Sequence, residues 1–157
     1  MSPEISDKVK RQVEDILSRY PRPQAALLPV LHCLQRERGF ISPAEERWVA
    51  ERMGIKPIKV REAVTFYTML RQRPAGRYHL QVCSNLSCAL EGGDSLLSYL
   101  AERLGIKIGE TTADGRFTLS TVECLGACDE APCLMVNFDY LTRLDRDKVD
   151  RLLRELD

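Results

Sequence analysis

Over the first 75 positions, hydrophobic residues recur at intervals of three and four, which is the period of an α-helix. Ser42 followed by Pro43 and Glu45 has the spacing of a helix-capping box. We expect four helices: one that starts at Ser2–Pro3 and ends before Pro21, one from Gln24 to about Arg38, one from Ser42–Pro43 to Met53, and one over Pro57–Phe66. Residues 1–75 are therefore predicted to form an all-helical bundle.

From Gly76 onward, the hydrophobic period changes to two, the period of a half-buried β-strand. The first predicted strand runs into Cys83. The pattern then predicts a helix over about Gly93–Leu104, a strand over Arg116–Glu123, a short strand over Cys133–Phe138 and a last helix capped near Asp145. The order β, α, β, β, α over residues 76–157 describes a small α/β sandwich, so the whole chain is predicted to be α+β.

Composition and charge narrow the function classes. The chain has 23 basic and 23 acidic side chains and 44% hydrophobic residues. It can bury a core, and it lacks the general positive charge that attracts nucleic acid or anionic lipid. Residues 1–75 carry 14 basic and 9 acidic side chains, whereas residues 76–157 carry 9 and 14. This asymmetry is either a coincidence of two solvated faces or an indication that the halves meet different surfaces of a larger assembly.

The beginning of the chain does not resemble a secretory signal. The most apolar stretch, Ala25–Leu34, is shorter than the roughly 18 to 20 residues that a membrane-spanning helix needs. We therefore expect a protein that stays inside the cell and does not insert into the membrane. In a reducing compartment, paired cysteines are more often metal ligands or redox thiols than structural disulfides.

Four of the six cysteines form two close pairs. Cys83 and Cys88 are separated by four residues, Cys124 and Cys128 by three, and 35 residues lie between the pairs. Each pair follows a predicted strand, and strand ends can project two loops from one edge of a sheet. Soft thiolates select zinc, copper(I) or iron–sulfur clusters. The loose C-x4-C spacing favours a 2Fe-2S cluster over a zinc knuckle, with zinc and catalytic or unliganded thiols as the alternatives.

The residues around the paired cysteines bear on the reduction potential of such a cluster. Small and polar residues, such as Ser84, Asn85 and Gly126, let backbone N–H groups approach the sulfurs. The acidic residues near the second pair are Glu123, Asp129 and Glu130. Because negative charge opposes electron uptake by an anionic cluster, we expect a low reduction potential, softened by the loop N–H donors.

Longer motifs carry a resemblance to a known family. Val122–Pro132, which includes the second cysteine pair, and the runs Gly92–Asp94, Gly109–Thr112 and Asp114–Leu119 resemble the E-subunit family of NADH:quinone oxidoreductase, respiratory complex I. Glu62–Tyr67 is similar to that family's junction between its helical bundle and its ferredoxin domain. The similarity covers nearly the whole chain.

The resemblance implies a thioredoxin-like ferredoxin domain over residues 76–157, behind the helical bundle of residues 1–75. It implies one 2Fe-2S cluster held by Cys83, Cys88, Cys124 and Cys128, and a heterodimer with the flavin- and NADH-binding F-subunit within a larger assembly. FMN and NADH are expected only on that partner, because this chain has no glycine-rich phosphate loop after a strand. The chain would be a non-catalytic electron-transfer subunit, cytoplasmic and held peripherally on the cytoplasmic side of the inner membrane by the complex.

The other cysteines and the histidines are expected to be structural. Cys133 departs from the family, which usually has an aliphatic residue after the Ala-Pro. We expect it to be a buried strand residue, because free cysteine behaves as a small hydrophobe. Cys33 lies among the leucines of the second helix, and neither His32 nor His79 lies in a loop beside a cysteine pair.

Two alternatives to this function remain from the sequence. One is the equivalent small subunit of an NAD-linked hydrogenase or formate dehydrogenase, which has a similar cysteine layout. The other is a zinc-stabilised helix-turn-helix DNA-binding protein, because Gly54 lies between two predicted helices of the basic half. Against DNA binding, Arg61 and Glu62 on the second of these helices partly cancel in charge.

Overall fold

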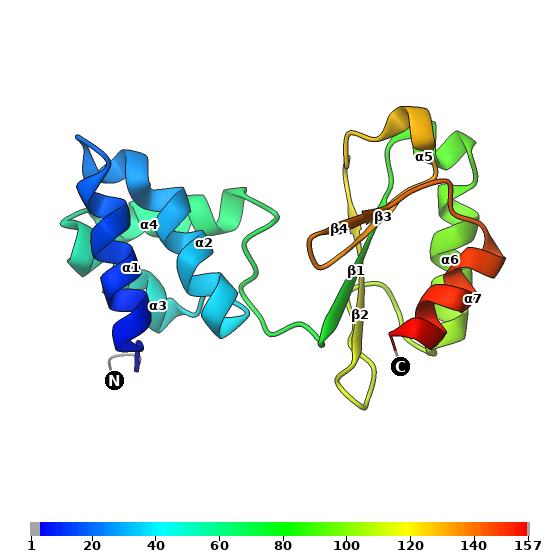
Figure 1. The fold of residues 1–157 in the computed structure, drawn as a ribbon, viewed down its shortest axis with the longest axis horizontal. Helices are drawn as coiled ribbons and strands as arrows, with labels where there is room; N and C mark the ends of the chain where they lie inside the picture. Colours follow the sequence, from blue (N-terminus) through cyan, green and yellow to red (C-terminus); the bar gives the residue numbers. More distant parts are fainter. Residues whose placement is uncertain (1–3, 157) are drawn as a thin grey trace. The chain divides into compact units, whose positions relative to one another are not determined.

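The computed structural model describes residues 4–156, and the chain divides into two compact units, one up to Pro74 and one from Ala75. The first unit consists of helices, and the second contains a four-stranded sheet with helices packed on it (Figure 1). The predicted α+β class is thereby confirmed.

The helical unit has one hydrophobic core, to which each of its four α-helices contributes. Its elements are α1 (Asp7–Ser18), the short 3-10 helix η1 (Pro23–Ala26), α2 (Leu27–Arg38), α3 (Pro43–Met53) and α4 (Pro57–Phe66). Val13, Leu31 and Val49 from three of these helices are fully buried. Among the described residues, no helix has the length and apolarity needed to cross a membrane.

The first two helices begin later than predicted. Ser6, not Ser2–Pro3, caps α1, by accepting a hydrogen bond from the Val9 N–H; Ser2 and Pro3 lie outside the described residues. The Gln24 segment forms the 3-10 turn η1, and α2 starts only at Leu27. Pro29 then falls in the first turn of α2, where a proline costs no intrahelical hydrogen bond, so it does not interrupt the helix.

The capping box predicted at the start of α3 is present. The Ser42 hydroxyl accepts a hydrogen bond from the Glu45 N–H at 3.3 Å, and the Glu45 carboxylate accepts one from the Ser42 N–H at 2.6 Å. The Glu45 side chain is buried and also pairs with Arg38 at 2.9 Å. This cap therefore joins the end of α2 to the start of α3.

The substitution Ser42→Ala is expected to lower the free energy of unfolding of the helical unit by about 1 kcal/mol, because the Glu45 N–H loses its partner. Trp48, the single tryptophan of the chain, lies on α3 and packs against the core, so its fluorescence reports this transition in urea. Ser18→Ala at the exposed end of α1 is the matched control. An equal loss in both variants would contradict the role of the capping box.

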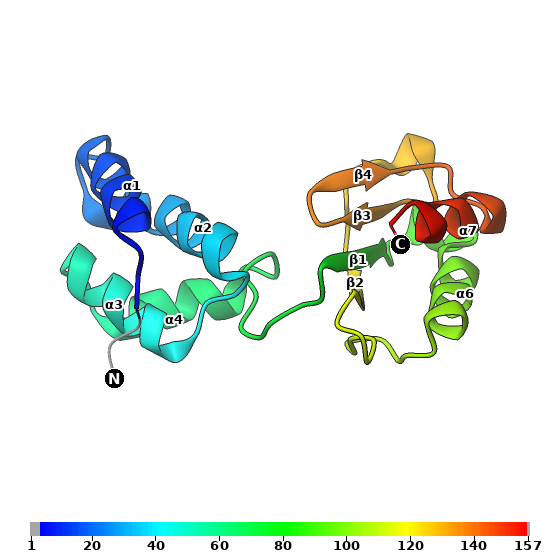
Figure 2. The same cartoon turned by 60° about the horizontal axis from the view of Figure 1, so that its bottom comes forward.

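The second unit is built on a mixed sheet with the strand order β2-β1-β3-β4. Its elements are β1 (Tyr78–Cys83), α5 (Leu86–Leu90), α6 (Gly93–Leu104), β2 (Phe117–Val122), the 3-10 turn η2 (Cys128–Glu130), β3 (Leu134–Val136), β4 (Asp139–Leu141) and α7 (Arg146–Glu155). β1 is parallel to β2, and β3 is antiparallel to both β1 and β4. Figure 2 shows α6 and α7 beside each other on one side of the sheet.

The predicted order β, α, β, β, α lacks two short elements, α5 and β4. α5 has five residues, fewer than two helical turns, and β4 has three residues of which Asp139 and Tyr140 are exposed. Neither is long enough to display a hydrophobic period. The strand predicted over Cys133–Phe138 covers only Leu134–Val136, because Asn137 adopts a positive φ of 56° at the turn into β4.

Candidate metal centre

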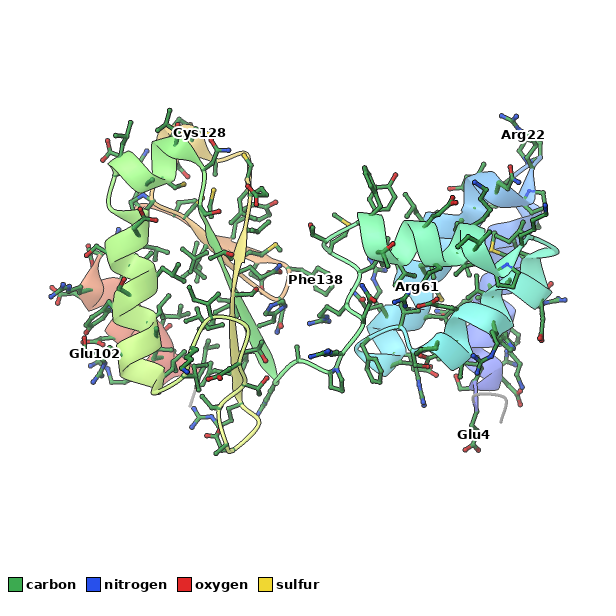
Figure 3. The ribbon with its side chains drawn as sticks, turned by 180° about the vertical axis from the view of Figure 1, so that it is seen from behind. Glu4, Arg22, Arg61, Glu102, Cys128 and Phe138 are labelled. Carbon is green, nitrogen blue, oxygen red and sulfur yellow. The ribbon has the colours of Figure 1, made fainter. Side chains whose placement is uncertain are left out.

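The parallel pairing of β1 and β2 brings both cysteine pairs to one edge of the sheet. The register ends with Cys83 opposite Val122, so the two chain segments leave the sheet side by side. Cys83 is the last residue of β1, and Cys88 lies in α5, which follows at once. Cys124 lies in the loop after β2, and Cys128 begins η2. Figure 3 labels Cys128 at this end of the unit.

Three cysteine sulfurs lie close together below the surface. The sulfurs of Cys83, Cys88 and Cys133 are all within 4.8 Å of one another, and each of these residues is at most 2% exposed. The Sγ atoms of Cys88 and Cys133 are 3.6 Å apart. This three-cysteine group is therefore close enough to bind a metal ion, and its member Cys133 is not among the four predicted ligands.

Strand register explains why Cys133 lies there. β1 and β3 pair with Leu80 opposite Val136 and Val82 opposite Leu134, so the next pair along the ladder is Cys83 and Cys133. The Cys83 N–H donates to the Cys133 carbonyl at 3.1 Å. Cys133 is buried as predicted, but it precedes β3 and does not lie within a strand. Its position beside Cys88 was missed because the pairing partner of β3 is not visible in the sequence.

Cys124 and Cys128 are exposed. Within residues 4–156, no group of three or more mutually close metal-binding atoms includes either of them. Their loop nevertheless contacts the first pair, because Leu125 and Ala127 pack against the three-cysteine group. The Gly126 N–H donates to the Cys124 sulfur at 3.3 Å, from a backbone with φ of 74° that favours glycine.

The three buried thiols differ in acidity. Burial by itself raises the pKa of Cys83, but the backbone N–H groups of Asn85 and Leu125 together with the thiols of Cys88 and Cys133 outweigh it, and the net shift of this pKa is downward. Burial raises the pKa of Cys88, and burial together with the neighbouring Cys88 raises the pKa of Cys133 to about 12. Loss of the thiol proton on metal binding is therefore easier at Cys83 than at Cys88.

The donor set fits a 2Fe-2S cluster. Such a cluster needs four thiolates, backbone N–H groups that reach the sulfurs, and a partly shielded position. The buried Cys83 and Cys88, together with the exposed Cys124 and Cys128 on the adjoining loop, supply the four thiolates. The Gly126 N–H donates to the Cys124 sulfur, and the N–H groups of Asn85 and Leu125 lower the pKa of Cys83, so backbone N–H groups reach sulfurs of both pairs.

The acidic surroundings are less negative than the sequence suggested. The Glu130 carboxylate pairs with Arg143 at 3.1 Å and accepts a hydrogen bond from the Thr142 hydroxyl at 3.0 Å. Arg143 was not anticipated, because it lies beyond β4 in the chain. One of the three carboxylates expected to depress the reduction potential is thus offset by a cation.

The other candidate ligands lie outside the three-cysteine group. His79 is buried in β1, with Nε2 2.7 Å from the Ser120 hydroxyl. Cys33 is half-buried on α2 and donates to the Gln12 side chain at 3.4 Å. His32 is also on α2, where burial and then Arg36 lower its pKa.

The helix-turn-helix alternative gains no support from α3 and α4. Arg61 on α4 pairs at 2.7 Å with Glu46, which is buried on α3, and Lys59 pairs with Glu62 at 2.8 Å. These contacts neutralise the basic side chains that a recognition helix would direct at phosphates.

Comparison with known proteins agrees with the geometry. The family model of the thioredoxin-like 2Fe-2S ferredoxins matches residues 13–157. The E 2 subunit of NADH-quinone oxidoreductase from Rhizobium meliloti (strain 1021) is 45% identical over 145 residues, which cover 92% of this chain and 86% of the relative. The E-subunit of NADH-quinone oxidoreductase from Mycobacterium tuberculosis (strain ATCC 25618 / H37Rv) is 38% identical over 154 residues, 98% of this chain and 61% of the relative.

Solved structures share the fold. A crystal structure of an NAD+-reducing NiFe-hydrogenase in the H2-reduced state matches with a TM-score of 0.72 and 25% identity over 83% of this chain. The air-oxidised state matches with a TM-score of 0.67 and 23% identity over 85% of this chain. This chain spans only 22% of the hydrogenase chain in each case. On the family match and the identity to its relatives, the chain belongs to the thioredoxin-like 2Fe-2S ferredoxins, within the E-subunit family of NADH-quinone oxidoreductase.

Proposed function

We propose that this chain is an electron-transfer subunit of NADH:quinone oxidoreductase that carries one 2Fe-2S cluster. The cluster would exchange an electron with the flavin of an adjacent NADH-binding protein, the F-subunit of the complex, with which this chain would form a heterodimer. FMN and NADH would bind to that partner, and this chain would turn over no substrate by itself. The names of the relatives and the family match support this proposal.

The proposed ligands are Cys83, Cys88, Cys124 and Cys128. The observation that carries this assignment is the packing of Leu125 and Ala127, from the loop of the second pair, against the buried group that contains Cys83 and Cys88. A bound 2Fe-2S cluster supplies one-electron chemistry. The chain's own part is to hold the four sulfurs and to direct N–H donors at them, which stabilises negative charge.

We assign the cluster-binding role to residues 76–157 and a supporting role to the bundle of residues 1–75. The compact unit from Ala75 onward supports this division, because it contains the five cysteines other than Cys33 and its own hydrophobic core. Peripheral attachment to the cytoplasmic side of the inner membrane would come from the assembled complex.

Two exposed leucines mark a surface that suits the flavin-bearing partner. Leu86 and Leu90 lie on α5 with Cys88 between them, and they are 70% and 78% exposed. Apolar side chains beside a redox site are stabilised when a partner covers them and excludes water. Docking there would bring a partner's flavin close to the cysteine edge, which electron exchange requires.

A second candidate is the equivalent subunit of an NAD-linked hydrogenase or formate dehydrogenase. The similarity of fold to the NAD+-reducing hydrogenase supports it, although this chain spans 22% of that chain. The two candidates share the same cluster and differ in the proteins that surround it.

The deciding experiment is anaerobic purification of the assembly from its native host through a tag on this chain. We expect a flavin- and NADH-binding protein and quinone-reducing subunits to copurify. The isolated chain, prepared in the same way, should contain about two iron and two acid-labile sulfide per chain and give an EPR signal after dithionite reduction. Copurification with hydrogenase or formate dehydrogenase subunits would favour the second candidate. A colourless zinc protein would refute both.

A further inference from the structure

A fifth thiol lies against the proposed ligands without being one of them. We infer that the Cys133 thiol donates a hydrogen bond to the Cys88 sulfur and thereby raises the reduction potential of the cluster. This inference rests on the proposed function. Cys133 would act through Cys88 and not touch iron, so it is a positioning residue for the electrostatics of the site.

The Cys133 sulfur is held in place by its backbone on both sides. The Cys133 carbonyl accepts from the Cys83 N–H at 3.1 Å, and the carbonyl of the preceding Pro132 accepts from the Leu144 N–H at 3.1 Å. The Cys133 residue is 1% exposed, so its side chain has little room to rotate toward solvent. The fold therefore holds the Cys133 sulfur in contact with the Cys88 sulfur, at a distance of 3.6 Å.

Charge decides which of the two sulfurs is the donor. Cys88 becomes a thiolate when it binds iron, and a thiolate can only accept hydrogen bonds. Cys133 holds no iron in this arrangement and lies among anionic sulfurs in a buried space. Losing its proton would add another negative charge there, so it remains a thiol. The S–H bond can then be donated to the Cys88 sulfur, 3.6 Å away, while the Cys83 sulfur also lies within 4.8 Å.

A hydrogen bond to a ligand sulfur favours the reduced state of the cluster. Reduction adds one negative charge, which spreads onto the ligand sulfurs, and a donor stabilises that charge. The hydrogen bond raises the reduction potential, whereas the carboxylates of Glu123 and Asp129 near the second pair lower it. Removing the donor should therefore make the cluster harder to reduce.

The test is potentiometric EPR of the cluster-loaded full chain and of the variant Cys133→Ala. We expect unchanged iron and sulfide contents but a more negative midpoint potential. At a fixed ambient potential near the midpoint, the ratio of reduced to oxidised cluster should fall about three- to ten-fold, the range of one ordinary hydrogen bond. A ten-fold change corresponds to 59 mV for one electron.

Matched variants separate hydrogen bonding from packing. Cys133→Ser retains a donor of similar size and should return the potential most of the way to that of the parent chain. Cys133→Val fills the space without a donor and should behave like Cys133→Ala. Cys33→Ala removes a thiol from the helical unit and should leave the potential unchanged.

Each outcome has a distinct meaning. Equal potentials in the parent chain, Cys133→Ala and Cys133→Val would overturn the inference and leave the proposed function intact. Loss of the cluster from both Cys133→Ala and Cys133→Ser would identify Cys133 as an iron ligand, which also overturns it. A parent chain that binds no cluster would refute the proposed function itself.

A measurement on the parent chain covers the case in which a variant does not fold. The infrared S–H stretching band of a buried, hydrogen-bonded thiol is displaced from that of a free thiol and moves on deuteration. We expect such a band in the cluster-loaded chain and a further displacement of it on reduction, as the Cys88 sulfur gains charge. A band that reduction leaves unmoved would contradict the contact.

Discussion

The variant Cys124→Ser is expected to lose the 2Fe-2S cluster while both units keep their fold. Cys124 is exposed, and its sulfur accepts one hydrogen bond, from the Gly126 N–H, so the fold does not depend on it. A serine hydroxyl is a harder and far less acidic ligand than a thiol, and it binds iron weakly at neutral pH. Iron should fall from about two per chain to less than a tenth of that value, with loss of the visible absorption.

Cys33→Ser is the matched control for this loss. It makes the same chemical change in the helical unit, on α2, and should leave the iron content and the spectrum unaltered. The far-ultraviolet circular dichroism of Cys124→Ser should equal that of the parent chain prepared without iron. Should Cys124→Ser keep its full iron content while Cys133→Ser loses it, the four-ligand assignment is wrong and the three-cysteine group holds the metal.

The variant Gly93→Ala is expected to destabilise the second unit by about 1 to 3 kcal/mol, the cost of overpacking a core. Gly93 is the first residue of α6 and is buried. A Cβ at this position would lie 2.7 Å from the Cys88 carbonyl oxygen and 3.0 Å from its carbonyl carbon. Because these are backbone atoms, the segment that carries Cys88 must move, and cluster binding should weaken with it. Urea denaturation followed by circular dichroism measures the first effect, and iron content the second.

The direction of the stability change in Gly93→Ala distinguishes overpacking from the ordinary effect of this substitution in a helix. Glycine to alanine in a helix ordinarily stabilises by about 0.5 to 1 kcal/mol. The exposed position Ser95 on the same helix is the control, since Ser95→Ala should leave stability unchanged or slightly raised. A stabilising Gly93→Ala would mean that the approach of α6 to Cys88 is looser than the structure describes.

Long elements with a strong hydrophobic period could be predicted from the sequence. α4 (Pro57–Phe66) and α6 (Gly93–Leu104) begin and end at the predicted residues, and β1 (Tyr78–Cys83) ends at the predicted Cys83. Each is bounded by a local feature, such as Pro57 at the first turn of α4 or Gly105 after α6 in the left-handed conformation. Such features act within a few residues, so they can be seen in the sequence.

Short elements could not be predicted, for the opposite reason. α5 and β4 have too few residues to show a period, and tertiary contacts stabilise them. The pairing of β4 with β3, for example, depends on the turn at Asn137, whose φ is positive. Its conformation depends on hydrogen bonds to β1, since its side chain accepts from the His79 N–H at 3.0 Å.

The sequence by itself determined the two cysteine pairs, their place after two strands, and the family to which the chain belongs. Spacing and motif are local properties, and thiolate chemistry follows from residue type alone. Only the tertiary structure decided which sulfurs meet. The antiparallel register of β1 and β3 places Cys133 opposite Cys83 and within 3.6 Å of Cys88. That register joins residues that lie far apart in the chain, and it is set by the burial of whole strand faces, which no short stretch of sequence contains.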